Sequence, residues 1–338
     1  MLGIGIKINY SSILETPMNN PKVSILLMTY NHERFIKRAI ESALSQTYEN
    51  IEIIISNNGS SDNTSSVIKS FLPNSKINFL DYADNCNTND RANEAIDMAS
   101  GDYISWLYGD DYYFNSKIED QIKIFKQLDS TYGVVYGPGY TENFFSKELT
   151  LCHGPRSSGN VLHSFFSGWL KNGSVIPISP LVKKEVYLKY RYDNSIFAEG
   201  EVLYMHIACK FKFHFLDKPL VVMTEHETNL GKAFKDNMES HEHSIFRLIR
   251  ENYLSEESMK QAMAHLCELK IGSSWHAFRV GKEIKWAKKN LYEAFRMNKL
   301  RSFKNKYFFL SLLILHLPRK MQSFINTIVL VIKRYALS

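Results

Sequence analysis

Two adjacent carboxylates, Asp110 and Asp111, are the residues of this chain best placed for chemistry. They follow Gly109 and an apolar, aromatic run over 103–107, so they stand where a strand is predicted to end. That edge of an open α/β sheet is where ligands bind. Adjacent carboxylates repel each other, and a divalent cation that prefers hard oxygen ligands, Mg²⁺ or Mn²⁺, would remove the repulsion. Taken alone, the pair is more simply explained as a solvated turn or a helix cap.

Two further polar segments follow predicted strands in the same way. Thr29-Tyr30-Asn31 comes directly after the first predicted strand, and Asn57-Asn58 comes directly after the second. Loops at these positions can offer small polar side chains and helix N-terminal amides to a nucleotide and its phosphates. Considered by themselves, such residues are ordinary turn and helix-start chemistry.

Three charged side chains complete the candidate set. Arg91 precedes the acidic strand and could bind a phosphate, although a lone arginine is more often a surface cation. Glu199 and Glu201 begin a helical stretch, where a carboxylate could face a substrate. The helix macrodipole by itself also favours acids in a first turn. Each feature is weak alone, and their order and spacing together are what is improbable by chance.

The elements that must position these residues alternate between strand and helix. Continuous apolar runs predict buried parallel strands, and apolar residues at helical spacing predict the helices between them. Such alternation means an α/β fold, with a mostly parallel sheet and helices on both faces. The expected strands lie at 23–28, 51–55, 77–80 and 103–107, and the expected helices at 35–44, 61–72, 90–99 and 116–128.

From about residue 141 the sequence becomes rich in loops, with scattered glycine, proline and aromatic residues. A helical pattern returns at 201–209, and two closing strands are expected at 211–215 and 220–223. Residues 242–300 are expected to be helical, with amphipathic stretches at 255–269 and 282–296.

Composition excludes several classes of protein. With 44% hydrophobic and 13% aromatic residues, the chain can bury a sizeable core and is not disordered. The 4 cysteines are widely spaced, without a CxxC pair, so neither a zinc site nor a disulfide framework is indicated. No signal peptide pattern and no membrane-spanning apolar run is present. We therefore expect a cytoplasmic protein with reduced thiols.

The order of these motifs resembles the inverting family 2 glycosyltransferases of bacterial glycan biosynthesis, which have the GT-A fold. The resemblance covers about 21–229. The first strand and helix, the uracil-binding loop over 53–64, the metal-binding strand that ends at Asp111, and a closing segment with His226 and Asn229 all have counterparts in the chain. The resemblance implies nucleotide-sugar binding by Thr29, Tyr30, Asn31, Asn57, Asn58, Arg91, Gly109 and Asp110, and metal binding by Asp110, Asp111 and His226.

Two positions depart from the family pattern. Residue 57 is Asn where the family usually carries an Asp that accepts from uracil. Because an amide can pair with either edge of that ring, a uridine nucleotide remains the expectation. Residue 108 is Tyr where many members carry the first acid of an Asp-x-Asp motif, and Asp110 fills the position of its last, metal-holding acid.

The resemblance implies a metal-dependent, inverting transfer of a sugar from a nucleoside diphosphate donor, expected to be a UDP-sugar. The acceptor would be a hydroxyl of a glycan or a lipid-linked glycan, and no nucleic acid partner is expected. The family's catalytic carboxylate aligns nearest to Gly200, so Glu199 or Glu201 would be the general base, with Glu201 preferred. The alternatives are a nucleotidyltransferase-like metal enzyme and a catalytically silent nucleotide-sugar-binding protein.

We expect four regions along the chain. A flexible leader at 1–20 precedes a catalytic domain at 21–240, with a nucleotide-sugar half at 21–140 and an acceptor half at 141–240. A helical region at 241–300 and an amphipathic, basic tail at 301–338 follow. The tail holds two short apolar stretches between cationic residues, so it is a helical hairpin packed on the domain, a helix pair resting on an anionic inner leaflet, or a self-association surface that forms a homo-oligomer.

Overall fold

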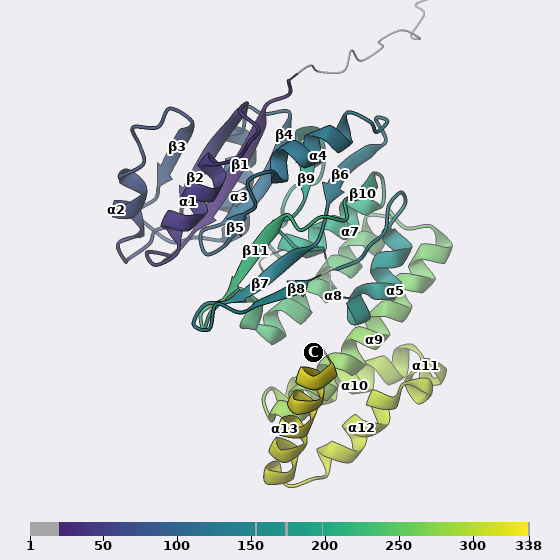
Figure 1. Cartoon of the computed structure of the whole chain (residues 1–338). Coiled ribbons are helices and arrows are strands. Elements are labelled where there is room, and N and C mark those ends of the chain that lie inside the picture. The colour runs from purple at the N-terminus through teal and green to yellow at the C-terminus, as the bar shows by residue number, and fades with distance from the viewer. Residues whose placement is uncertain (1–19, 153, 173–174, 198, 337–338) are drawn as a thin grey trace, which may run out of the picture.

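The computed structural model describes residues 20–336, except 153, 173–174 and 198. Almost all of the expected leader, residues 1–19, lies outside the described residues. Within them the chain forms two sheets flanked by helices, followed by a helical C-terminal region (Figure 1). The α/β fold class predicted from the sequence is confirmed.

The larger sheet has seven strands in the order β10-β6-β9-β4-β1-β2-β3. The strands β1, β2, β3 and β4 are parallel neighbours, as predicted, and β9 is antiparallel to both β4 and β6. Every residue of β1 and β2 is buried, because helices cover both faces of the sheet. The strands are β1 (Val23–Thr29), β2 (Ile51–Asn57), β3 (Ile77–Asp81), β4 (Tyr103–Tyr108), β6 (Tyr132–Tyr136), β9 (Leu181–Lys183) and β10 (Lys212–Phe215).

Four helices of the first half connect these strands. Each lies within the range predicted from apolar spacing, apart from the first two residues of α3. The helices α1, α2 and α4 are shorter than predicted, and α3 is one residue longer. The buried face of α1 packs Ile36, Ala39 and Ile40 against the sheet. The helices are α1 (Ile36–Leu44), α2 (Thr64–Lys69), α3 (Thr88–Met98) and α4 (Lys117–Phe125).

The smaller sheet was not predicted as such. It has the order β5-β11-β7-β8, and its strands are β5 (Tyr112–Tyr113), β7 (Gly139–Asn143), β8 (Leu149–Cys152) and β11 (Val221–Glu225). Only β11 corresponds to an apolar run seen in the sequence. The others are short, so their strand state comes from pairing with a neighbour and not from their own pattern. β5 and β7 pair with β11, and β8 pairs with β7.

Helices make up most of the rest of the chain. The structure places α8 eight residues earlier than the expected helical region and makes α9 one long helix that continues through Gly272 and ends before Gly281. Figure 1 shows α9 to α13 gathered at the opposite end of the molecule from β1, β2 and β3. The helices are α5 (Leu162–Asn172), α6 (Lys184–Lys189), α7 (Leu203–Ala208), α8 (Phe234–Arg250), α9 (Glu256–Val280), α10 (Ile284–Met297), α11 (Lys299–Lys304), α12 (Lys306–Leu315) and α13 (Arg319–Ala336).

A buried carboxylate fixes the N-terminal edge of the large sheet. Glu52, on β2, accepts from the Lys22 ammonium at 2.9 Å, from the Ser24 hydroxyl at 2.5 Å and from the Ser100 N–H at 2.6 Å. Burial alone would raise the pKa of Glu52, but these hydrogen bonds outweigh it and lower the pKa to about 2. One side chain therefore joins the start of β1, β2 and the turn before β4.

Glu52→Gln should lower the free energy of unfolding at pH 7 by about 2–3 kcal/mol, because the folded pKa lies below the unfolded value. That stability is present above the unfolded pKa and is lost as the pH falls toward about 2. Urea unfolding at pH 7 and pH 3 should show the difference between the two proteins shrink in acid. Glu148→Gln, an exposed glutamate, is the matched control and should change nothing. A difference that does not vary with pH would contradict this role of the carboxylate.

Candidate active site

The carboxyl ends of β1, β2 and β4 meet at one edge of the large sheet. Thr29 lies opposite Asn57, and Met28 lies opposite Tyr108. The loops that follow β1 and β2 are bonded together, since the Asn31 amide oxygen accepts from the Ser61 N–H at 2.8 Å. Asn31 has a positive φ of 56°, a conformation that asparagine tolerates better than most residues. Segments far apart in the sequence thus form one polar surface.

Three side chains at this edge could hold a cation. The ligand atoms of His32, Asp110 and His226 all lie within 4.8 Å of one another. His226 Nε2 is 3.0 Å from Asp110 Oδ2, and His32 Nε2 is 4.0 Å from the same oxygen. The three residues follow β1, β4 and β11, so both sheets contribute to the cluster.

The two imidazoles are oriented by hydroxyl groups behind them. Thr29 Oγ1 lies 3.3 Å from His32 Nδ1, and Thr228 Oγ1 lies 3.0 Å from His226 Nδ1. A partner on one ring nitrogen fixes the tautomer and turns the other nitrogen toward a metal, as in most histidine metal sites. Two imidazole nitrogens and a carboxylate oxygen suit Mn²⁺ better than Mg²⁺, which prefers oxygen ligands alone. The residues present therefore fit a divalent cation.

The protonation states of Asp110 and His32 also favour metal binding. Burial alone would raise the pKa of Asp110, but the hydrogen bond from His226 and the charge of His32 outweigh it and lower the pKa. Burial also lowers the pKa of His32, so its imidazole tends to be neutral. An ionised carboxylate beside a neutral imidazole is the state in which both can bind a metal.

The side chain of Asp111 lies outside the cluster of His32, Asp110 and His226, although Asp111 follows Asp110 in the sequence and was predicted to bind the metal with it. Its Oδ1 accepts from the Thr224 N–H at 2.8 Å, and the side chain is buried. Burial, followed by the charge of Asp110, raises the pKa of Asp111 well above its usual range. It is not part of the cation cluster among the described residues, and its contacts indicate that it anchors β11 behind the cluster.

Gly109 allows the close approach that brings Asp110 to the end of β1. A Cβ added at this position would lie 2.4 Å from Thr29 Oγ1 and 2.7 Å from His32 Nδ1. Any side chain would therefore push apart the strand ends and displace His32. Gly109 was predicted to take part in nucleotide-sugar binding. The structure gives a steric reason for a glycine here that does not involve a nucleotide.

On the β2 side, Asn57 is held in one orientation. Its Nδ2 donates to Asp81 Oδ1 at 2.8 Å, and its Oδ1 accepts from the Ser60 hydroxyl at 2.5 Å. Asp81 ends β3 directly opposite Asn57, and its carboxylate also accepts from Ser65. Sequence reasoning missed Asp81 and His32. An acid at the end of the third strand and a histidine just after Thr29-Tyr30-Asn31 were the available signals.

Asn58 and Arg91 are brought together but are engaged with protein groups. The Asn58 amide accepts from the Cys86 N–H at 3.0 Å and donates to the Cys86 carbonyl at 2.9 Å. Arg91 Nε donates to Asn58 Oδ1 at 3.3 Å, and its guanidinium lies 3.3 Å over the Tyr82 ring. The two residues fix the loop before α3 at the edge of the polar surface, and Tyr30 lies exposed at the same edge.

The two candidate bases differ in surroundings. Glu199 is fully buried, accepts from the Asp193 N–H at 2.6 Å and pairs with Arg247 at 3.0 Å. Burial raises the pKa of Glu199 to about 7, although Asp193 and Arg247 partly oppose the shift. The backbone of Glu201 lies in the short helix η1 (Gly200–Val202), and its side chain lies outside the described residues. A Cβ added at Gly200 would lie 3.8 Å from the Tyr108 hydroxyl, so this turn faces the end of β4.

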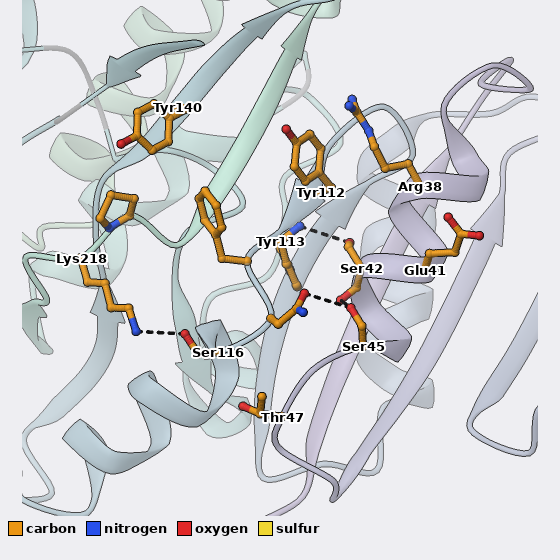
Figure 2. Close-up of a pocket in the computed structure, with 13 residues that line it drawn as sticks. Arg38, Glu41, Ser42, Ser45, Thr47, Tyr112, Tyr113, Ser116, Tyr140 and Lys218 are labelled. Carbon is orange, nitrogen blue, oxygen red and sulfur yellow. Dashed lines mark hydrogen bonds between the residues drawn. The ribbon is translucent and has the colours of Figure 1, made fainter. Parts of the chain in front are cut away.

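A groove of about 910 Å³ lies between α1 and the smaller sheet. Figure 2 shows its aromatic wall, with Tyr112 and Tyr140 labelled, and the serine hydroxyls of α1 opposite. Its cations are paired: Arg38 binds Glu142 at 2.7 Å, and Lys218 binds Asp120 at 2.6 Å. The groove is lined by none of the three cation-cluster residues, so it is a separate surface.

A sequence profile described as "Glycosyl transferase family 2" matches residues 24–184. This segment contains β1 to β4, the carboxylate Asp110 and one of the two histidines. Residues 24–184, just under half of the chain, are therefore similar to glycosyl transferase family 2. The family match stops before Glu199, Glu201 and His226, so the roles of these residues are not transferred by it.

Curated relatives of the chain are named glycosyltransferases. The chain is 37% identical over 169 residues to an uncharacterised glycosyltransferase of Rickettsia conorii and covers 25% of that protein. It is 42% identical over 117 residues to one of Rickettsia typhi and covers 36% of it. Glycosyltransferase GlyG of Streptococcus pneumoniae is 23% identical over 211 residues, which is 60% of this chain and 68% of GlyG. The chain thus spans about a third or less of the Rickettsia proteins it matches.

Solved structures share the fold over more of the chain than the family 2 segment. S. aureus TarS superposes with a TM-score of 0.61 over 90% of this chain and 54% of TarS, at 12% identity. The mannosyltransferase PcManGT from Pyrobaculum calidifontis, in complex with GDP-Man and Mn²⁺, superposes with a TM-score of 0.58 over 92% of this chain and 85% of PcManGT, at 14% identity. At such identities the likeness shows the fold alone, and the predicted GT-A architecture is confirmed.

Asp110→Asn should weaken Mn²⁺ binding by at least about tenfold, because it removes the charged ligand of the cluster. Asp111→Asn is the matched control. It should bind Mn²⁺ like the unaltered protein, since an amide oxygen can still accept from Thr224. Isothermal titration calorimetry with the metal alone measures both variants. Equal losses in the two variants would mean that the carboxylates act as a pair, as the sequence alone suggests.

Proposed function

We propose that this protein transfers a sugar from a nucleoside diphosphate donor to an acceptor hydroxyl, with inversion at the anomeric carbon and dependence on a divalent cation. The observation that carries the proposal is the cluster of His32, Asp110 and His226 at the carboxyl edge of a family 2 fold. It lies where an open α/β sheet binds its ligands.

Neutralising the leaving diphosphate is the main electrostatic task of such a reaction. A cation bound by His32, Asp110 and His226 would supply Lewis-acid stabilisation of that charge. Other side chains of the protein hold these three ligands in position. Thr29 and Thr228 orient the imidazoles, and the Asn229 amide donates to Asp110 Oδ2 at 3.2 Å. These contacts hold the ligand atoms in place before the donor binds.

We assign the base-recognition role to Asn57, supported by Asp81. Hydrogen bonds from Ser65, Asn57 and Lys69 lower the pKa of Asp81 against the opposing effect of burial, so it stays an acceptor. An ionised Asp81 fixes which end of the Asn57 amide faces which way. A uracil ring suits the site because the fixed amide has both a donor and an acceptor valence left.

Glu201 is the proposed general base. Both oxygens of Glu199 already have partners, and the side chain has no exposed surface. Glu199 therefore serves to hold the turn through Asp193 and Arg247. Glu201 follows Gly200, whose position beside Tyr108 supports placing this turn at the reacting end of the site.

The proposed acceptor is a glycan or a lipid-linked glycan at the inner face of the cell membrane. Support for a neutral, sugar-like acceptor comes from the groove along α1, which offers the aromatic side chains Tyr112, Phe114 and Tyr140 together with small hydroxyls. Because Arg38 and Lys218 are paired within its walls, the groove carries little unbalanced charge.

The products formed from candidate donors test the function. Incubation of the full chain with a panel of nucleoside diphosphate sugars and Mn²⁺ should release free nucleoside diphosphate, and a chelator or Asp110→Asn should stop the release. Chromatography of the nucleotides provides the measurement. Release of pyrophosphate from nucleoside triphosphates would instead indicate a nucleotidyltransferase. Donor binding without any product would indicate a silent binding protein.

Glu201→Gln should reduce kcat by a factor on the order of 10² or more, because the amide keeps the shape but cannot take a proton. Donor affinity, measured by calorimetry, should remain. Glu199→Gln is the matched control two residues away. It should keep most of kcat and alter thermal stability instead, since it disturbs the contacts with Asp193 and Arg247. Full activity in Glu201→Gln would place the base elsewhere.

A further inference from the structure

The helices α11, α12 and α13 expose many large apolar side chains to solvent. Among the residues whose side chains the structure describes, Leu300 and Leu313 are each 66% exposed and Phe324 is 65% exposed. Monomeric proteins rarely expose contiguous apolar patches of this kind without a binding partner. The exposed set, which we call the apolar face, comprises Leu300, Phe303, Tyr307, Phe309, Leu310, Leu312, Leu313, Met321, Phe324 and Ile328.

The opposite side of α12 and α13 packs against α9, so the two helices are docked on the rest of the protein while the apolar face stays exposed. Phe308 and Ile314 of α12 are buried in a cluster with Phe278 of α9. On α13, Asn326 accepts from the Arg279 guanidinium at 2.6 Å. One face of α12 and α13 therefore belongs to the core of the helical region, and the opposite face is left outward.

The charged side chains of α11, α12 and α13 have one sign. No aspartate or glutamate follows Glu293 in the sequence, whereas lysine and arginine recur. Lys304, Lys306 and Lys320 are exposed, and none of the three forms an ion pair with a described residue. Apolar side chains next to unbalanced cations match the two layers of an anionic membrane surface, its acyl boundary and its headgroups.

We propose that the apolar face and its cations dock on the surface of a bilayer that contains anionic lipid. No described helix is long and apolar enough to cross a membrane, so docking is peripheral. Phe303, Leu313 and Phe324 enter the acyl boundary, and Lys304, Lys306 and Lys320 contact the headgroups. This docking does not depend on the proposed transfer reaction.

A second copy of this chain is the rival occupant. A symmetric dimer through this face would bring two sets of cations together without any acidic residue to balance them, because none lies in α11, α12 or α13. Like charges facing each other oppose association. Figure 1 shows these helices at the far end of the molecule from β1, β2 and β3.

Co-sedimentation of the full chain with vesicles tests the docking. Vesicles of phosphatidylcholine and phosphatidylglycerol should pellet the protein, and vesicles of phosphatidylcholine alone should pellet far less. Replacing Leu313 and Phe324 together by Ser should weaken the partition coefficient by about tenfold or more, because both side chains leave the acyl boundary. Replacing Lys304, Lys306 and Lys320 by Ser should weaken it and reduce its dependence on salt.

The matched control is the pair Phe145→Ser and Leu188→Ser, two equally apolar side chains that are 70% and 53% exposed on the α/β part of the chain. This control should sediment with vesicles as well as the unaltered protein, and circular dichroism should show that every variant is folded. Failure of the unaltered protein to bind anionic vesicles would overturn the proposal. So would binding that the Leu313 and Phe324 changes leave unaltered, or an oligomer in analytical ultracentrifugation that these changes dissolve.

Discussion

The site depends on how one carboxylate, Asp110, stays ionised although its side chain is only 12% exposed. Burial opposes the charge, and the surrounding donors overcome that opposition. His226 and Asn229 approach the same oxygen from the segment after β11, and His32 approaches it from the segment after β1. A divalent cation would replace the weak positive character of these donors with a full charge, which is why the same three ligand atoms are suited to bind one.

The neighbouring carboxylate shows how position separates two chemically identical side chains. Asp111 is one residue further along and accepts a backbone N–H from Thr224. Its raised pKa and its contact with β11 make it part of the scaffold that carries His226 to the site. The smaller sheet is thus required for the cluster, because β11 brings the third ligand within reach of the ends of β1 and β4.

Much of this arrangement could be predicted from the sequence, because parallel strands that are buried on both faces are continuous apolar runs. The positions of β1, β2, β3 and β4, and hence of Thr29, Asn57 and Asp110, followed from that pattern. The smaller sheet could not, since β5, β7 and β8 are short and exist through pairing, β5 and β7 with β11 and β8 with β7. Roles within a cluster were also hidden. The family resemblance favoured Asp110 and Glu201, but the burial of Asp111 and Glu199 and their scaffold contacts are seen only in the structure.

His32 and Asp81 were not predicted because the role of each depends on a partner that is distant in the sequence. His32 lies only one residue beyond a predicted ligand loop, but its relevance depends on Asp110 and His226, which are distant in sequence. Asp81 likewise acquires a role only through its register with Asn57 across two strands. Both residues sit at strand ends on the carboxyl edge. Their positions at strand ends were therefore the signal that the sequence offered.

Electron spin echo spectroscopy of Mn²⁺ bound to the full chain is the most direct measurement of the cation cluster. With ¹⁵N-labelled histidine, we expect nitrogen couplings from imidazole ligands, reduced in His32→Ala and again in His226→Ala. Mn²⁺ that binds equally well to both variants and shows no coupling to histidine nitrogen would contradict the assignment of His32, Asp110 and His226 as the cation site.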